Sequence, residues 1–296
     1  MIQGIQIVAV VPSGRKRYLS ILISYLIREV NNGVIDRIDL WLNTVNHEDI
    51  AYIRSLANEH KFIRVVELEN GFEHISNPIA RVHLIRHFFK YAIDDAIYIR
   101  FDDDICYIEP GAITRLLDFR IKHPEYFLVY PSIINNGRTA YLHQIMGALD
   151  IPLDSRHPTA YADHMNLIKM KPEIGETIHR AFLDVLGKNL ISSVKFPKYI
   201  IRNYEKVPIN CICWFGSDFR QFGGEVGSDL CTEEEIWLTS IKPKLDNRLN
   251  CIFGESIVAH FSFHTQKEYL ESTNLLRYYQ LIAQSEGNHT VALSKF

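Results

Sequence analysis

The sequence lacks the features that mark several specialised classes of protein. Its 296 residues include five cysteines, an odd number, with no CxxC pair among them. This pattern matches neither a zinc site nor a disulfide framework, so we expect reduced thiols. Cys211 and Cys213 stand two residues apart in a strand-like run, and we expect both to pack in the core.

Long apolar runs and an excess of one charge are also absent. No stretch approaches the roughly 18 apolar residues of a membrane-spanning helix, and the amino terminus lacks the regions of a signal peptide. The net charge of −3 argues against a surface that binds polyanions. We therefore expect no nucleic-acid partner, no transmembrane segment, and a cytoplasmic location, either in solution or peripheral to a membrane.

The first half of the sequence does contain a regular alternation of strand and helix patterns. Apolar runs at residues 5–11, 36–43 and 62–68 have the length of buried strands, and helical patterns follow the first two. Short crossover helices between strands predict a parallel sheet wound in the right-handed sense.

The most informative stretch is residues 96–108, which read AIYIRFDDDICYI. An apolar strand pattern runs into three consecutive carboxylates, Asp102, Asp103 and Asp104. Their mutual repulsion would destabilise the strand end unless a cation lay against them, and a divalent metal with oxygen ligands suits this position best. We therefore expect a metal site where this strand ends.

A strand that runs into Asp102-Asp103-Asp104 resembles the DxD motif of nucleotide-sugar-dependent glycosyltransferases with the GT-A fold. The resemblance implies a single Rossmann-like α/β domain over residues 1–296, with a mostly parallel central sheet flanked by helices and a smaller acceptor-side subregion. It implies a nucleotide-sugar-binding half at 1–134, an acceptor and catalytic half at 135–265, and a helical tail at 266–296.

The resemblance also implies a metal, Mn²⁺ or Mg²⁺, held by Asp102 and Asp104 together with a histidine near the carboxyl end. Residues 255–264, ESIVAHFSFH, alternate as a strand and place His260 and His264 on one face. We expect His260 as the ligand, with His264 as the second candidate.

The same resemblance implies a nucleoside-diphosphate sugar as donor, with UDP favoured over GDP and dTDP, and a saccharide or glycolipid as acceptor. Arg15 and Arg17 lie in the turn after the first strand, where an open α/β sheet binds its ligands. We expect the donor to contact these residues: Pro12, Ser13, Arg15, Arg17, Asn43, Arg81, Asp102 and Asp103.

A second candidate site follows glycines 223, 224 and 227, where a helix begins with acidic residues. Glu234 is in phase with Trp237 and Leu238, so it points inward, and an acid on the apolar side of a helix suits a general base with a raised pKa. The GT-A resemblance instead selects Glu235 as the base. Asp229, on the preceding loop, is a third candidate, and a base of this kind favours an inverting mechanism.

Two other functions remain open at this point. A sugar-nucleotide nucleotidyltransferase also joins an α/β sheet to metal-binding acids, but it should show a glycine-rich signature directly after the first strand, where GRKR supplies one glycine. A non-catalytic nucleotide- or sugar-binding module would leave the inward acid idle. The main expectation is a hexosyltransferase of polysaccharide or glycoconjugate synthesis.

Overall fold

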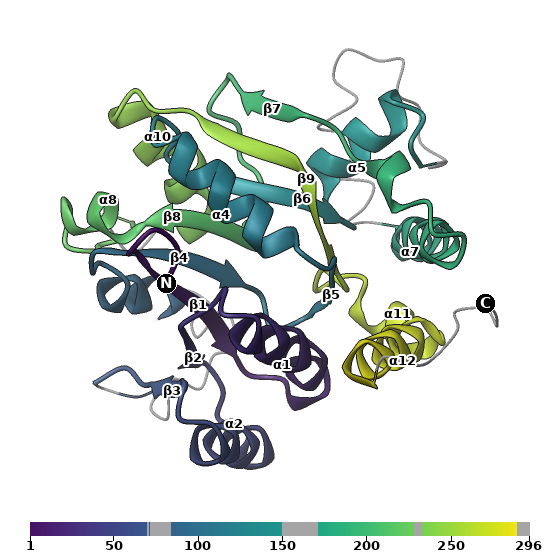
Figure 1. The fold of residues 1–296 in the computed structure, drawn as a ribbon, viewed down its shortest axis with the longest axis horizontal. Coiled ribbons are helices and arrows are strands. Elements are labelled where there is room, and N and C mark those ends of the chain that lie inside the picture. Colours follow the sequence, from purple (N-terminus) through teal and green to yellow (C-terminus); the bar gives the residue numbers. More distant parts are fainter. Residues whose placement is uncertain (70, 72–83, 150–170, 228–232, 289–296) are drawn as a thin grey trace.

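The computed structural model describes residues 1–69, 71, 84–149, 171–227 and 233–288. Within these ranges the chain forms one nine-stranded sheet with the strand order β3-β2-β1-β4-β8-β6-β9-β5, and β7 pairs with β9 beside this path. Helices cover the sheet (Figure 1). The strands are β1 (Gln6–Ser13), β2 (Arg37–Leu42), β3 (Ile63–Val66), β4 (Ala96–Phe101), β5 (Ile105–Ile108), β6 (Val129–Ile134), β7 (Lys198–Ile201), β8 (Cys211–Phe215) and β9 (Asn250–His260).

The first half of the sheet is parallel, as the alternation of patterns predicts. β1 pairs in parallel with β2 and β4, and β2 pairs in parallel with β3. The connections carry α1 (Lys16–Asn31) and α2 (His47–Glu59). β1 and β4 are buried along almost their whole length, which explains why their sequences are continuous apolar runs and not alternating ones.

The second half makes the sheet mixed, so the expectation of a mostly parallel sheet is wrong. β8 runs antiparallel to both β4 and β6, and β9 runs antiparallel to β5 and β7 but parallel to β6. The reason lies in the connections. Only three residues separate β4 from β5, too few for a crossover, so β5 leaves the side of β4 and pairs with β9.

Helices of the second half pack on the sheet and on one another. α4 (Ala112–Lys122) contacts β9, β6 and β8, while α12 (Leu275–Asn288) contacts α1 and β5 (Figure 1). The other helical elements are η1 (Leu84–Tyr91), α5 (Gly137–Ile145), α7 (Pro172–Gly187), η2 (Ile191–Val194), α8 (Gly216–Arg220), α9 (Glu234–Ile236), η3 (Trp237–Ile241), α10 (Lys242–Leu245) and α11 (Lys267–Ser272).

Three elements differ in detail from what their sequence suggests. The strand expected at 255–264 is β9, which begins at Asn250 and ends at His260, so His264 lies beyond it. β7 lies in a segment where no sustained strand pattern is visible, because it is a short strand with two half-buried positions and one exposed. In the described residues just before β4 the chain forms a 3₁₀ helix, η1, and not an α-helix.

Cys211 and Cys213 pack in the core, as expected. Cys106, Cys211, Cys213 and Cys251 are buried and free.

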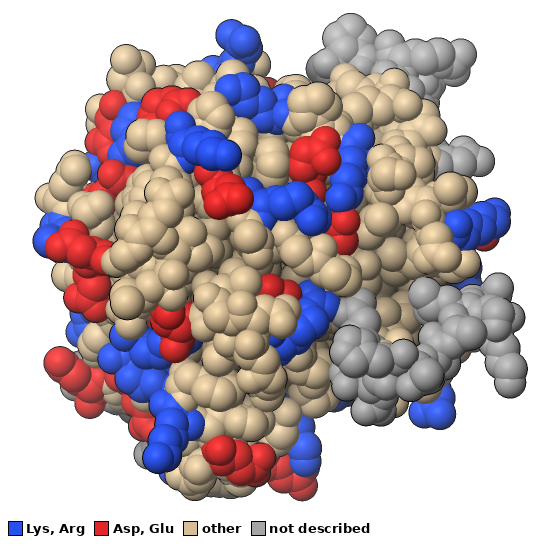
Figure 2. Space-filling model, in the orientation of Figure 1, with Lys and Arg blue, Asp and Glu red and all other residues tan. Residues whose placement is uncertain are grey.

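Within the described ranges, no helix has both the length and the apolar character needed to cross a membrane. On the face shown in Figure 2, basic and acidic side chains intermingle, as the small net charge suggests.

Candidate metal centre

The three aspartates form the connection from β4 to β5, and strand pairing fixes their position. The Asp102 backbone N–H donates to Asn210 O at 2.8 Å, because Asn210 directly precedes β8, the antiparallel neighbour of β4. On the other side, the Phe261 N–H donates to Asp104 O at 2.9 Å, and Ile105 pairs with His260 across β5 and β9. The register of two strand pairs therefore brings residues more than 100 positions apart to one point.

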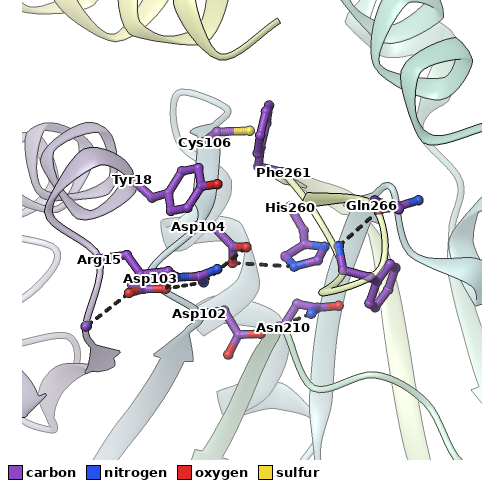
Figure 3. Close-up of polar contacts among 12 residues, drawn as sticks. Arg15, Tyr18, Asp102, Asp103, Asp104, Cys106, Asn210, His260, Phe261 and Gln266 are labelled. Carbon is purple, nitrogen blue, oxygen red and sulfur yellow. Dashed lines mark hydrogen bonds and ion pairs between the residues drawn. The ribbon is translucent and has the colours of Figure 1, made fainter. Parts of the chain in front are cut away.

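The side chains of Asp102, Asp104 and His260 form a candidate metal-binding cluster. Each offers one ligand atom, and these atoms all lie within 4.8 Å of one another. Figure 3 shows Asp104 facing His260, with Asp102 on the side of Asn210. Carboxylate oxygens are the ligands that Mn²⁺ and Mg²⁺ prefer in proteins, whereas an imidazole nitrogen is typical of transition-metal sites, so this mixed set suits Mn²⁺ better than Mg²⁺.

The orphaned atoms of the cluster fit a bound cation. Asp104 Oδ1 and His260 Nδ1 are buried and have no hydrogen-bond partner among the described residues. Asp104 Oδ1 lies 3.4 Å from His260 Nε2, too far for a strong hydrogen bond. A buried carboxylate oxygen without a partner is costly, and coordination of a metal would remove that cost.

Arg15, at the start of α1, neutralises part of the acidic triplet. It donates to Asp103 Oδ1 through Nε at 2.9 Å and also through Nη2, and its Nη2 lies 3.1 Å from Asp104 Oδ2. The Gly14 N–H adds a hydrogen bond of 3.0 Å to Asp103 Oδ2. Burial opposes ionisation of Asp104, but Arg15 and His260 more than offset it and hold the pKa of Asp104 well below its usual range. For Asp103, burial prevails over Arg15 and raises the pKa.

Arg100, in β4, links the triplet to the acidic helix. Its Nη2 donates to Asp102 Oδ1 at 2.9 Å, and its Nη1 donates to Glu234 Oε1. Burial raises the pKa of Glu234 to about 7, and Arg100 opposes that rise. Asp102 Oδ2 also accepts a hydrogen bond of 3.0 Å from Asn210 Nδ2.

The formal charge of this group of residues matches a divalent cation. Four carboxylates, those of Asp102, Asp103, Asp104 and Glu234, contact two guanidinium groups, those of Arg15 and Arg100. In the absence of a cation, burial lowers the pKa of His260 but Asp104 raises it above its usual value. With the four carboxylates ionised and His260 neutral, the form that binds a metal, two negative charges are left over. One dication would balance them.

Three of the four predicted metal ligands lie together, and the fourth does not. The structure brings Asp102, Asp104 and His260 together, as expected. His264 is exposed in the turn after β9 and is not part of this cluster. The end of β9 at His260 separates the two histidines, because the alternation of faces continues only as far as the strand does.

The predicted donor-binding residues are also divided. Arg15 lies on the triplet, but Arg17 pairs with Glu271 at 2.9 Å. Pro12 and Ser13 are buried in β1, and Ser13 Oγ donates to Val11 O. Asn43 lies beside this loop, and its Oδ1 is buried without a partner among the described residues. Arg81 lies outside the described residues.

Of the three predicted bases, two lie in the described part of the chain. Glu234 points inward, as its helical phase predicts, and contacts Arg100. Glu235 is less buried and lies 3.2 Å from Lys206 Nζ. Asp229 lies outside the described residues.

Sequence reasoning missed Arg100, Asn210 and Asn136. Arg100 is the one charged residue in the otherwise apolar β4, and a charge inside a buried strand is a signal that a partner exists. Asn135-Asn136-Gly137 suggests a turn and nothing more. Asn136 nevertheless caps α5 and donates to Asn210 Oδ1 at 3.2 Å.

Comparison with known proteins gives no match to any protein-family model or to any curated protein. Among solved structures, CMP:2-keto-3-deoxy-manno-octonic acid synthetase complexed with CTP matches with a TM-score of 0.45 and 13% identity, over 95% of this chain and 99% of that one. A mycobacterial protein matches with a TM-score of 0.47 and 13% identity, over 96% of this chain and 74% of that one. Neither TM-score reaches 0.5, so these likenesses identify no function for this chain.

The glycosyltransferase expectation finds no support in this comparison and is withdrawn. The neighbour with a stated activity is a synthetase complexed with CTP, not a glycosyltransferase. The assignment of the aspartate triplet to that motif, and of the protein to the hexosyltransferases of polysaccharide or glycoconjugate synthesis, is corrected accordingly. This correction does not affect the geometry of the acidic cluster, because that geometry follows from the register of the strands.

Proposed function

We propose that this protein is a divalent-metal-dependent nucleotidyltransferase that joins a nucleoside monophosphate from a nucleoside triphosphate to a sugar-derived acceptor. The observation that carries the proposal is the convergence of Asp102, Asp104 and His260, with ligand atoms within 4.8 Å of one another, at the carboxyl end of a parallel strand beside Arg15. In open α/β sheets, ligands bind beyond the carboxyl ends of such strands.

The location of the cluster favours a phosphate-bearing substrate. β1 and β4 are adjacent and parallel, so the loop after β1 and the triplet after β4 lie at the same edge of the sheet. That loop brings Gly14 and Arg15 to Asp103. A divalent cation held by these acids would neutralise negative charge on the phosphate oxygens of the substrate. This is the main contribution of a bound divalent metal in such a site.

The arginine contacts favour transfer at phosphorus. Each carboxylate of the group, on Asp102, Asp103, Asp104 and Glu234, already contacts Arg15 or Arg100, so among the described residues the cluster contains no carboxylate free of a cation. Such a site is suited to positioning and to charge neutralisation. Phosphoryl-type transfer depends chiefly on those two effects.

The proposed reaction is a substitution at the α-phosphorus. An acceptor oxygen forms a bond to that phosphorus, the bond from phosphorus to the α,β-bridging oxygen breaks, and inorganic pyrophosphate leaves. The acceptor proton passes to solvent. Arg15 lies where it can bind a phosphate oxygen if it exchanges part of its contact with Asp103, because its side chain is about one-third exposed while that of Asp103 is buried.

The test is release of pyrophosphate by the purified chain. The four ribonucleoside triphosphates are each mixed with Mn²⁺ or Mg²⁺ and a panel of sugar acids and sugar 1-phosphates. We expect acceptor-dependent release with at least one pair of substrates, and loss of that release with excess EDTA. Asp104→Asn should reduce the rate at least about 100-fold, since it removes a charge that the cation needs.

The matched control is Asp95→Asn, the same substitution at an aspartate that is 82% exposed and pairs with Arg220 outside the cluster. It should keep the wild-type rate. Circular dichroism checks that both variants are folded. The proposal fails if no acceptor supports release of pyrophosphate, or if folded Asp104→Asn works as well as the control.

A further inference from the structure

Two buried asparagine side chains, Asn210 and Asn136, form a chain of hydrogen bonds that leads to Asp102 of the metal-binding cluster. Asn210 contacts Asp102 twice, since its backbone oxygen accepts from the Asp102 N–H at 2.8 Å and its Nδ2 donates to Asp102 Oδ2 at 3.0 Å. Arg100 holds the other oxygen of the same carboxylate. Each carboxylate oxygen has two lone pairs, so both contacts leave a position open for a cation.

The orientation of the Asn210 amide is imposed by Asn136. The backbone N–H of Arg138 can only donate, and it donates to Asn136 Oδ1 at 3.0 Å, so the Nδ2 of Asn136 faces away from the helix as a donor. That Nδ2 lies 3.2 Å from Asn210 Oδ1 and 3.4 Å from Pro208 O, both acceptors. With its oxygen occupied in this way, Asn210 must present its Nδ2, a donor, to Asp102.

The neighbouring Asn135 reaches the other ligand-bearing strand. Its Nδ2 donates to Phe261 O, one residue after His260, at 2.9 Å, and to Gln266 Oε1 at 3.0 Å. Asn135 has a φ of +59°, a conformation that asparagine tolerates better than most residues. Figure 3 shows Asn210 beside Asp102 and Gln266 beyond His260. The turn after β6 thus contacts both sides of the cluster.

We propose that Asn210 and Asn136 are positioning residues of the metal centre, Asn210 fixing the carboxylate of Asp102 and Asn136 fixing the donor direction of Asn210. This inference rests on the proposed function, because it assigns the pair a role toward the same cation. Both residues are buried, with 6% of Asn210 and 1% of Asn136 exposed, so water competes little for these hydrogen bonds. Loss of such supporting groups typically weakens metal binding about 10- to 100-fold.

The test uses one substitution, Asn→Ser, at three positions. Serine is too short to reach across to the next amide but is a good helix cap. Asn136→Ser therefore keeps the cap of α5 and removes the contact to Asn210, and Asn210→Ser removes the contact to Asp102. Asn46→Ser is the matched control, because Asn46 caps α2 by accepting from Glu48 N and Asp49 N and has no link to the cluster.

The measurement is the Mn²⁺ dissociation constant of each full-length variant, followed by the electron paramagnetic resonance signal of free Mn²⁺. We expect at least tenfold weaker binding for Asn136→Ser and Asn210→Ser and unchanged binding for Asn46→Ser. The urea midpoint in EDTA reports on structure alone. There, Asn136→Ser should lower the midpoint more than Asn46→Ser, because it leaves the buried Asn210 Oδ1 without its donor. A purely structural role would show the same loss of stability and leave Mn²⁺ affinity intact.

Two failures are distinguishable. If wild-type protein binds no Mn²⁺, both the proposed function and this inference are overturned. If wild-type protein binds Mn²⁺ and folded Asn136→Ser binds it within twofold of wild type, the inference alone is overturned. If Asn210→Ser does not fold, the Mn²⁺ affinity of Asn136→Ser alone tests the inference, because serine retains the N-cap of α5.

Discussion

At the scale of single residues, Arg100 is the group on which the acidic site most depends. Its two terminal nitrogens contact different acids, Asp102 and Glu234, which approach from different elements. Burial would lower the pKa of Arg100, but the charges of Glu234 and Asp102 outweigh it and raise the pKa. A planar guanidinium meets the two carboxylates with two separate nitrogens, whereas a lysine would have to meet both with a single ammonium nitrogen.

We therefore predict that Arg100→Lys lowers the free energy of unfolding by about 2 kcal/mol, because one buried acid loses a charged hydrogen bond. Urea unfolding at pH 7 measures the effect. Arg64→Lys is the control, since Arg64 is half exposed and shares Asp39 with Arg37. It should cost less than about 1 kcal/mol. Equal stability of wild type and Arg100→Lys would show that the bridge to two acids contributes nothing.

The chemically distinctive residues of the site could be predicted from the sequence, and their supporting residues could not. Asp102, Asp104 and His260 stand out because carboxylates and imidazoles near apolar strands need a reason to be there. Asn210 and Arg100 are defined by partners 108 and 134 residues away, which depend on strand pairing. Helical phase correctly predicted that Glu234 points inward, but it gave no information on what the carboxylate would face.

At the scale of elements, the site depends on how each strand ends. β4 and β9 end, and β8 begins, beside the same acids, and antiparallel pairing of β8 with β4 places Asn210 opposite Asp102. The residues after β6 contact Asn210 and Phe261. The strands of the first half could be predicted because a βαβ alternation determines their order and direction. For β8 and β9 the sequence predicts a strand but not its neighbour, which is why the direction of pairing was missed.

A buried histidine in α5 provides a test of how α5 packs against β6. His143 is buried, lies 3.1 Å from Ser132 Oγ of β6, and has a pKa lowered to about 4, chiefly by burial. The folded-state pKa is below the unfolded value of about 6.5, so the unfolded chain binds more protons between these values and stability falls as the pH drops through this window. At pH 5 this single residue should reduce the free energy of unfolding by about 2 kcal/mol relative to pH 7.

The check compares urea unfolding at pH 7 and pH 5 for wild type, His143→Gln and His47→Gln. The loss between the two pH values should be smaller by about 2 kcal/mol in His143→Gln, which has no imidazole to protonate. His47 is exposed at the start of α2, so its variant should follow wild type. If His143→Gln loses as much stability as wild type, the buried neutral imidazole is not responsible.

At the scale of the whole molecule, the mixed sheet is what completes the site. The parallel strands from the first half of the chain supply Arg15 and the aspartates, while β8 and β9 supply Asn210 and His260 through antiparallel pairing. In a mostly parallel sheet, as predicted from the sequence, β8 and β9 would not pair with β4 and β5 in this way. Asn210 and His260 would then not be brought to the aspartates. The cluster therefore depends on long-range topology, and metal binding should stabilise the folded chain as a unit.

The most direct test of the central claim is a calorimetric titration of Mn²⁺ into the full-length chain and into Asp104→Asn, each with and without a nucleoside triphosphate. We predict one Mn²⁺ per wild-type chain and tighter binding when the triphosphate is present. Saturation at 100 times the dissociation constant should then raise the free energy of unfolding by about 2.7 kcal/mol. Binding of Mn²⁺ that is equally strong in Asp104→Asn, or no binding to the wild-type chain, would contradict the account.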